Sequence, residues 1–342
     1  MRVEKLMDHE DGTIWDTWVA PRTHTVTDLF AWSAVVREAY GMKAHLMIAR
    51  DEQGHIRGSL SLYEVRHPLL GHYLTTAPFG NDGGLLYDDL RARDVLLAEA
   101  KRLCSERRTT HVVIRTSGED LPSFQPDHRY HTAVVDLRDG AEGLWHRLPA
   151  TTRNQIRRGR KEGFVVHSGP AEVESFHRVF HAHMHQLGSP AHGPRYYHLI
   201  AKHLGPHARF LVVRDGDTVI AGALLFLCNG TAANIHTVAL RAYNRRCPNY
   251  LLYWHMLETA SELGCTRFDM GRSVEGSGNL NFKKNWCASV SPLSYNYGLR
   301  TLKDVPFADP RNPRYRLAID LWQRLPLRLT RSLGPHLISG LA

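Results

Sequence analysis

Cysteine is scarce in this 342-residue sequence, and no two cysteines stand in a C-x-x-C spacing. The five that occur are scattered, and an odd number is a poor basis for a disulfide framework. Cys228 and Cys265 lie in apolar runs, and we expect them to be buried thiols. The pattern favours a reducing compartment, so we expect a cytoplasmic protein.

Long apolar runs are also absent. No stretch of 18 apolar residues occurs, so the sequence predicts no membrane-spanning helix. The N-terminal segment MRVEKLMDHEDG is acidic and lacks the apolar core of a secretory signal, so no signal peptide is predicted.

Several catalytic and metal-binding signatures are missing. The sequence has neither the G-x-S-x-G turn of many hydrolases nor a Walker A loop. His181 and His185, in the run HAHMH, have the i, i+4 spacing of some metal ligands, but the glutamate of H-E-x-x-H is not between them. We interpret the two histidines as part of a polar helix face and predict no metal site.

Positive charge is plentiful, with a formal net charge of +9. This balance favours anionic partners such as nucleic acid, phosphorylated small molecules or an anionic membrane, although an indifferent basic surface is the alternative. The most basic segment is residues 150–164, where Arg153, Arg157 and Lys161 would share one stripe of a helix, with Arg160 beside them. Because such charges repel one another, we interpret the stripe as a phosphate-binding face; a solvated face is the alternative.

The hydrophobic periodicity predicts a mixture of helices and strands. Expected helices cover residues 23–40, 88–107, 172–186, 196–203 and 249–263, the last strongly amphipathic. Expected strands cover residues 45–49, 56–65, 72–76, 111–115, 130–137, 210–213, 218–227, 232–239, 266–270 and 290–297. The order helix, hairpin, strand, helix, strand, strand occurs twice, which predicts an α/β (α+β) protein with two tandem lobes, residues 1–139 and 140–299.

A tail, residues 300–342, follows the second lobe. Residues 312–322 have helical periodicity, and leucines then alternate with arginines. We expect the tail to pack on the first lobe; the alternative is an interfacial amphipathic segment in peripheral contact with a membrane.

The stretch from Gly264 to Trp286 is the strongest candidate for a ligand site. A buried strand, Thr266 to Met270, emerges into a glycine-rich loop that carries Arg272, and Lys283 follows the loop. Strands of α/β proteins that end in polar and charged loops commonly lie at ligand sites.

An ordered series of segments resembles the FemAB-type transferases, in particular the branch related to exosortase systems. The segments are APFGNDGGLL, LWHRLPATTRNQIRRGRKEGF, HQLGSP, LVVRDGDTVIAGALL, PNYLLYWHMLETASELGCTRFDMGRSVEGSGNLNFKKNW and PLSYNY, within residues 77–298. The resemblance implies two acetyltransferase-like (GNAT) lobes with the site in the second. It also implies transfer of an aminoacyl group from aminoacyl-tRNA to an amine of a small molecule or cell-wall precursor, without another cofactor.

The same resemblance suggests residues for the site. Lys283 matches the family's Phe-Lys position and is expected to stabilise developing negative charge. Asp269 is expected either to take the proton of the attacking amine or to pair with Arg272. Residues expected to bind substrate are Arg153, Asn154, Arg157, Arg158, Arg245, Arg246, Asn249, Arg272, Asn81, Gly83 and Gly84.

One departure from the pattern of acetyl-CoA-dependent proteins bears on the donor. Their glycine-rich pyrophosphate loop precedes a long helix, whereas the corresponding segment here, RAYNRRCPNY, has no glycine and contains a proline that lacks an N–H group. Acyl-CoA is therefore the second choice of donor, although Arg245 and Arg246 could still hold a phosphate.

Overall fold

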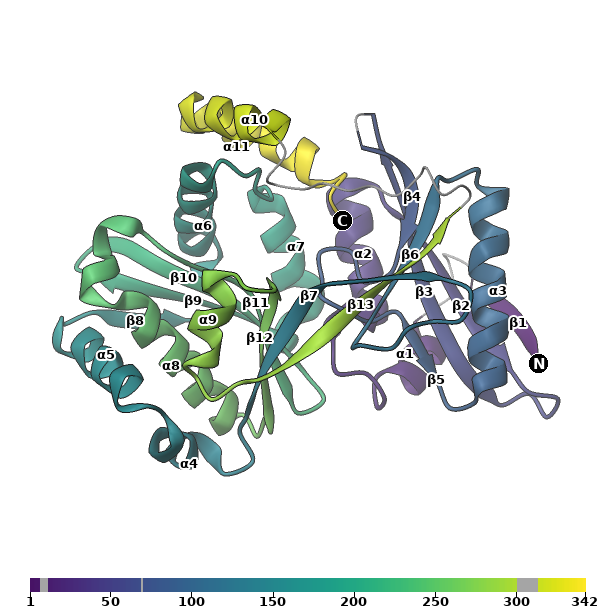
Figure 1. Cartoon of the computed structure of the whole chain (residues 1–342), viewed down its shortest axis with the longest axis horizontal. Coiled ribbons are helices and arrows are strands. Elements are labelled where there is room, and N and C mark those ends of the chain that lie inside the picture. The colour runs from purple at the N-terminus through teal and green to yellow at the C-terminus, as the bar shows by residue number, and fades with distance from the viewer. Residues whose placement is uncertain (7–11, 69, 300–312) are drawn as a thin grey trace. The chain divides into compact units, whose positions relative to one another are not determined.

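The computed structural model describes residues 1–6, 12–68, 70–299 and 313–342. They divide into two compact units (Figure 1). The first holds the described residues within 1–131, 291–307 and 339–342, and the second holds those within 132–290 and 308–338. Strands β7 (Gln125–Asp136) and β13 (Ser289–Leu299) each begin in one unit and end in the other.

The sheet of the first unit has the strand order β1-β2-β3-β4-β6-β13, with β5 paired to β3. Its other strands are β1 (Arg2–Leu6), β2 (Lys43–Arg50), β3 (Ile56–His67), β4 (Gly71–Thr75), β5 (Leu85–Tyr87) and β6 (His111–Thr116). The helices are α1 (Thr13–Val19), α2 (Phe30–Tyr40) and α3 (Leu90–Glu106). Alternate residues of β2 face opposite sides: Met47 and Ala49 pack in one core cluster with α3, while Leu46 and Ile48 pack in another with α1.

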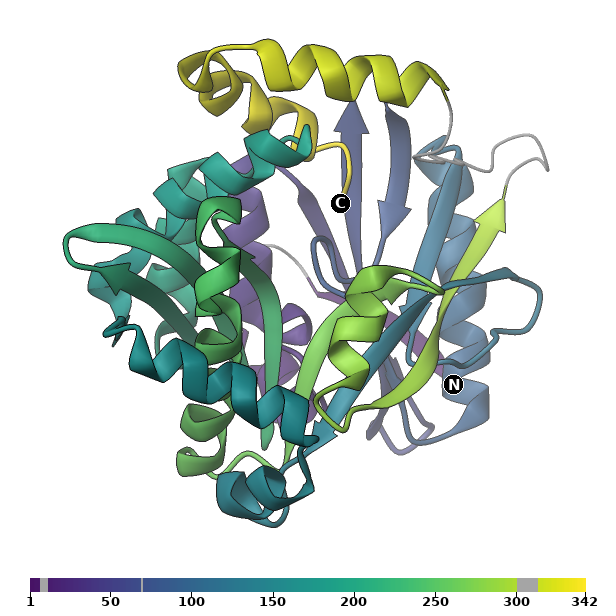
Figure 2. The same cartoon turned by 60° about the vertical axis from the view of Figure 1, so that its left-hand side comes forward.

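The second unit repeats this layered arrangement. Its strand order is β7-β12-β11-β10-β9-β8, with β8 (Val165–Ser168), β9 (Ala208–Asp215), β10 (Thr218–Cys228), β11 (Thr231–Ala239) and β12 (Arg267–Val274). Its helices are α4 (Gly140–Arg147), α5 (Ala150–Lys161), α6 (Val173–Leu187), α7 (Pro194–Leu204), α8 (Pro248–Glu262) and α9 (Gly278–Lys284), and the 3-10 turn η4 (Arg241–Arg246) precedes α8. Helices α6 and α8 lie on opposite faces of these strands (Figures 1 and 2).

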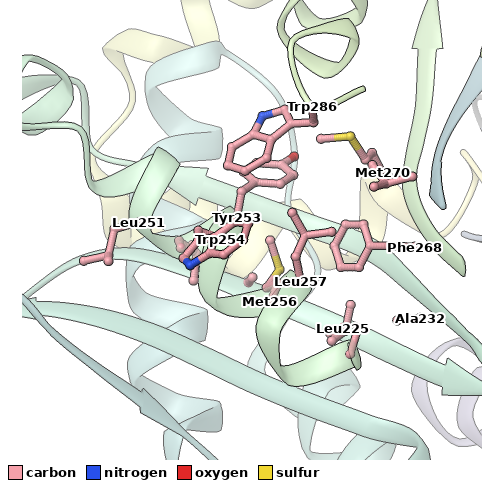
Figure 3. Packing of buried hydrophobic residues seen from close by; sticks show 14 of the residues in the cluster. Leu225, Ala232, Leu251, Tyr253, Trp254, Met256, Leu257, Phe268, Met270 and Trp286 are labelled. Carbon is pink, nitrogen blue, oxygen red and sulfur yellow. The ribbon is translucent and has the colours of Figure 1, made fainter. Parts of the chain in front are cut away.

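Helix α8 forms the centre of the core of the second unit (Figure 3). The sequence predicted one strongly amphipathic side, but the structure buries residues around most of the helix: Pro248, Leu251, Leu252, Tyr253, Trp254, Met256, Leu257 and Ala260. The reason is that α8 is covered by the sheet on one side and by α4, α5 and α9 on others. A helix enclosed in this way needs apolar residues all round.

The tail packs on a different unit from the one that the sequence predicted. Helices α10 (Pro313–Arg324) and α11 (Leu327–Ile338) belong to the second unit, where they contact α6, rather than to the first lobe. The backbone of Ile319 lies against Gly188, and the ring of His185 hydrogen-bonds to the carbonyl of Leu325 at 2.9 Å. Only the last residues return to the first unit, where Arg115 donates to the carbonyl of Ala342 at 2.7 Å.

The structure also bears on the predictions made for the cysteines and for membrane-spanning helices. None of the five cysteines, all of which lie in the described part of the chain, forms a disulfide, and Cys228 and Cys265 are buried as predicted. Within the described part of the chain, no helix is long and apolar enough to cross a membrane.

Candidate functional site

Two parallel strands part in the middle of the second sheet. Strands β11 and β12 pair over only three positions, from Thr231 opposite Arg267 to Ala233 opposite Asp269. Both strands continue beyond this point, to Ala239 and Val274. Their separation leaves backbone groups and side chains beside Asp269 that do not form a regular ladder, which is a common location for ligands in α/β proteins.

Lys283 reaches this point from helix α9. Its side chain is buried, with 2% of the residue exposed, and Nζ donates to the carbonyl oxygens of Gly271 at 2.6 Å and Arg272 at 3.1 Å. The start of α9 is fixed by Ser277, whose hydroxyl accepts from the backbone N–H of Leu280 at 3.2 Å. An ammonium group has three donors, so these two bonds leave one N–H for a ligand.

The surroundings of Lys283 include groups that lower its pKa and one that raises it. Burial lowers the pKa of Lys283 to about 8, Asp269 opposes this change, and the positive charge of Arg272 adds to it. Asp269 is itself fixed, because its Oδ1 accepts from the hydroxyl of Thr132 at 2.6 Å and from the N–H of Gly271 at 2.8 Å. These two hydrogen bonds fix the orientation of the Asp269 carboxylate beside Lys283.

Aromatic packing holds α9 in place. Trp286 is fully buried and stacks on Tyr250 with ring centroids 5.8 Å apart, while Phe282 meets Tyr253 edge-on at 5.2 Å. Figure 3 shows Trp286 above Tyr253 in the core. These side chains anchor the loop and helix that carry Lys283, so its position depends on the hydrophobic core of α8.

Helix α5 forms as the sequence predicted, but its basic residues differ in their roles. Arg153 is partly buried and donates to the carbonyls of Trp145 at 3.3 Å and His146 at 3.4 Å. Asn154 accepts from the guanidinium of Arg157 at 3.1 Å, and that guanidinium also lies over the Trp145 ring. Arg158 is exposed and forms no ion pair with any described residue.

The turn before α8, η4, likewise contains one exposed arginine and one that is already paired. Arg245 is exposed, whereas Arg246 forms ion pairs with both Glu162 and Asp215 and lies over the ring of Phe164. Because two carboxylates already neutralise Arg246, the exposed Arg245 is the better candidate for binding a phosphate. Asn249, the second residue of α8, is half-buried.

Helix α5 packs directly on the start of α8. A Cβ added to Gly159 would lie 2.9 Å from the carbonyl oxygen of Cys247, and the thiol of Cys247 contacts the side-chain oxygen of Gln155 at 2.7 Å. The charge of Arg158 also acts on the Cys247 thiol, and the same thiol lies 3.8 Å from the backbone carbonyl of Arg245 in the adjacent turn. We call the exposed side chains of Arg158 and Arg245 at this junction the α5–η4 basic surface.

The glycine-rich loop of residues 77–86 lies in the first unit. Gly83 and Gly84 have φ of +121° and +93°, and the N–H of Gly84 donates to the buried carboxylate of Asp28 at 2.6 Å. A Cβ on Gly84 would lie 2.5 Å from Thr76, and one on Gly83 would lie 2.5 Å from Asp28. Close packing inside the unit therefore explains both glycines without a ligand, and the carbonyl of Asn81 accepts from the hydroxyl of Tyr295 at 3.2 Å.

The sequence did not identify a cavity beside the free end of β11. It has a volume of about 240 Å³ and is lined by residues of β11, α6 and the following loop, including Phe180, His192 and His236. Burial lowers the pKa of His236 to about 4, and the positive charge of Arg272 on β12 adds to this effect. The segment HQLGSP precedes His192, but no spacing rule connects it with β11.

The predicted histidine pair lies on α6. His181 is close to the hydroxyl of Thr330 at 3.4 Å, and His185 contacts the tail as described. Among the described residues, no group of three or more histidine, cysteine, aspartate or glutamate side chains could hold a metal ion.

Residues 147–284 match the family model described as an acetyltransferase (GNAT) domain. The solved structure of FemX is similar, with 14% identity, a TM-score of 0.67, and coverage of 93% of this chain and 100% of that chain. L-PGS from Bacillus licheniformis has 11% identity, a TM-score of 0.57, and coverage of 92% and 98%. A tandem GNAT protein from the clavulanic acid biosynthesis pathway has 14% identity, a TM-score of 0.53, and coverage of 90% and 99%.

No curated protein matches the sequence at a significant level. The similarity to FemX and the tandem GNAT protein extends over most of the chain and confirms the predicted α/β fold with two GNAT-like parts. Residues 147–284 therefore resemble an acetyltransferase (GNAT) domain, and the chain as a whole has the fold of FemX.

Proposed function

We propose that the protein transfers an aminoacyl group from aminoacyl-tRNA to an amine of a small-molecule or cell-wall-precursor acceptor. The observation that carries the choice of donor is the α5–η4 basic surface, next to a helix start that lacks a glycine-rich pyrophosphate loop. The similarity to FemX and the FemAB-like segments support the same reaction class.

The start of α8 is poorly suited to the pyrophosphate of coenzyme A. Cys247 has φ of +60°, Pro248 provides no N–H, and α5 packs on the Cys247 carbonyl. The exposed Arg158 and Arg245 would instead contact phosphates of a larger anion from outside the helix start. A nucleic acid backbone fits such a surface, because its charge is spread over many phosphates.

The reaction requires one bond to form and one to break. The acceptor nitrogen attacks the ester carbonyl of the aminoacyl group, so that an amide C–N bond replaces the ester C–O bond. The electron pair goes to the ribose oxygen of the tRNA, which ends as a hydroxyl, and the attacking nitrogen loses a proton. The carbonyl oxygen carries negative charge at the intermediate stage.

Lys283 is suited to stabilise that charge. The two backbone carbonyls orient Nζ, and its remaining N–H can donate to the oxyanion. Because the pKa of Lys283 is about 8, the side chain is mostly protonated near neutral pH. Asp269 acts in this proposal by favouring the protonated form of Lys283, instead of as the general base that the sequence suggested.

The cavity beside β11 is the candidate acceptor subsite. It opens along the part of β11 that has separated from β12, and its wall combines apolar side chains with His192 and His236. Neutral imidazoles can donate to or accept from polar groups of an acceptor, while Phe180 excludes water from the amine.

The test is transfer from a charged tRNA pool. The purified protein is incubated with total tRNA carrying labelled amino acids and with a cell extract, and mass spectrometry identifies a product that gains one aminoacyl residue. Label should appear with the native protein and decrease at least ~100-fold with Lys283→Ala. Transfer at the native rate by a folded Lys283→Ala protein would remove Lys283 from the mechanism.

The second candidate is an acyl-CoA-dependent N-acyltransferase. The acetyltransferase model match and the parted strands β11 and β12 favour it. A rise in melting temperature with acetyl-CoA or a longer acyl-CoA, together with its consumption, would reverse the order of the two candidates.

A further inference from the structure

A second cavity in the second unit lies between helix α6 and tail helix α11. It has a volume of about 200 Å³. Helix α6 contributes His177, Arg178 and His181, and α11 contributes Arg328 and Arg331. It is separate from the cavity beside β11, with no lining residue in common.

The lining of this cavity is cationic. No carboxylate is among its lining residues; the nearby Glu174 is bound to His198 at 2.7 Å, and its charge also acts on His177 and Arg331. Arg328 and Arg331 are exposed and have no ion pair with a described residue. Because like charges repel, such a grouping of cations is most stable when an anion lies among them.

His177 provides an independent sign of a missing partner. It is 1% exposed, and neither ring nitrogen makes a hydrogen bond of ordinary geometry with a described residue. Burial and the charge of Arg331 lower the pKa of His177 to about 4, whereas the charge of Glu174 and a poorly aligned contact with the His192 backbone oppose this change. A buried polar group without a partner costs free energy, so an anion that accepts its N–H would satisfy it.

The surface next to the cavity is apolar. Leu327, Leu329 and Leu333 of α11 are each about half exposed, at 48%, 50% and 46%. The sequence from residue 321 to 342 contains three arginines and no aspartate or glutamate. Exposed leucines beside arginines fit the boundary between phosphate head groups and acyl chains.

We propose that helix α11 docks on an anionic lipid bilayer, with a lipid phosphate in the cavity between His177, His181, Arg328 and Arg331. The leucines enter the head-group region, and the arginines contact acidic lipids around the occupied cavity. This inference is independent of the transfer reaction, because none of these residues belongs to the proposed catalytic machinery.

The test is sedimentation of the full-length protein with vesicles. Vesicles of phosphatidylcholine mixed with phosphatidylglycerol are compared with vesicles of phosphatidylcholine alone. The native protein should sediment with the anionic vesicles, and Arg328→Gln/Arg331→Gln should weaken partitioning about 30-fold, which corresponds to about 1 kcal/mol for each arginine. Leu329→Ser/Leu333→Ser should weaken it through loss of apolar contact.

The matched control is Arg195→Gln/Arg267→Gln, which removes the same charge from two exposed arginines elsewhere in the second unit. It should retain most of the binding. An equal loss in this control, or equal sedimentation with neutral vesicles, would overturn the proposal. A melting temperature raised by inorganic phosphate in the native protein but not in Arg331→Gln, without vesicle binding, would assign the cavity to a soluble anion and also overturn it.

Discussion

The Nζ atom of Lys283 lies 2.6 Å from the carbonyl oxygen of Gly271, so a helix side chain is tied back to the strand that precedes it. The bond places a buried cation where β12 has left its parallel partner. Its functional consequences can be measured through pH, because the environment has moved the pKa of this lysine towards neutrality.

Transfer activity should decrease as the pH rises through about 8. The pKa of Lys283 is lowered to about 8, so the protonated form, to which we assign the stabilisation of the oxyanion, predominates below that pH and is lost above it. The measurement is kcat/KM against pH for the native protein. An activity that increases through the same range would instead make Lys283 a base.

Asp269→Asn should move this alkaline limb to lower pH by roughly one unit. The carboxylate of Asp269 raises the pKa of Lys283, and its removal leaves burial and Arg272 to lower it further. The limb is measured by the same pH profile, with Glu275→Gln, an exposed carboxylate of the adjoining loop, as control. A limb that stays in place while only the rate decreases would favour the general-base role for Asp269.

Arg158→Gln/Arg245→Gln should weaken tRNA binding and reduce the slope of log affinity against log salt by about 2 in total. Each arginine is expected to neutralise one phosphate on the α5–η4 basic surface. Filter binding at several salt concentrations measures the slope, and Arg195→Gln/Arg267→Gln serves as the charge-matched control. If both double variants change the slope equally, tRNA binding depends on the net charge of the protein and not on the α5–η4 basic surface.

Gly159→Ala should lower the free energy of unfolding by roughly 1 kcal/mol, although alanine normally favours a helix interior. Its Cβ would press against the backbone carbonyl of Cys247 at 2.9 Å and separate α5 from α8. Urea unfolding gives the value. Gly278→Ala is the comparison, because no atom lies within 4 Å of its Cβ position, and it should show no such loss.

Gly84→Ala should destabilise the protein by about 3 kcal/mol, from the combined cost of its left-handed backbone and the contact with Thr76. Gly54→Ala isolates the backbone part, because Gly54 has φ of +86° with nothing within 4 Å of an added Cβ. Similar losses of unfolding free energy in the two variants would show that packing does not explain Gly84. The loop would then again be a candidate for ligand binding.

The expected helices and strands largely occur in this chain, but β1, α1, α4, β8 and α9 were not expected from periodicity. The basic segment 150–164 does form a helix, over Ala150–Lys161, but the strand expected to end at Met270 continues to Val274. The FemAB-like segments also pointed to the GNAT fold. Helix α8 was harder to describe, since its burial depends on α4, α5 and α9, which approach from distant parts of the chain.

The candidate site was predicted only in part. The sequence identified Lys283, but its burial and its bonds to Gly271 and Arg272 arise when the aromatic side chains of α9 enter the core. The sequence also grouped Arg246 with Arg245, although only folding brings Glu162 and Asp215 to Arg246.

The sequence by itself determined much of the order of elements, the excess of positive charge and the segment that carries the candidate site residues. Those properties depend on local periodicity and residue type. Tertiary structure decided which cations remain available, where β11 and β12 part, and that α11 lies against α6. These outcomes depend on contacts between residues far apart in the chain, because the charge, hydrogen-bond partners and pKa of a side chain are set by its neighbours in space.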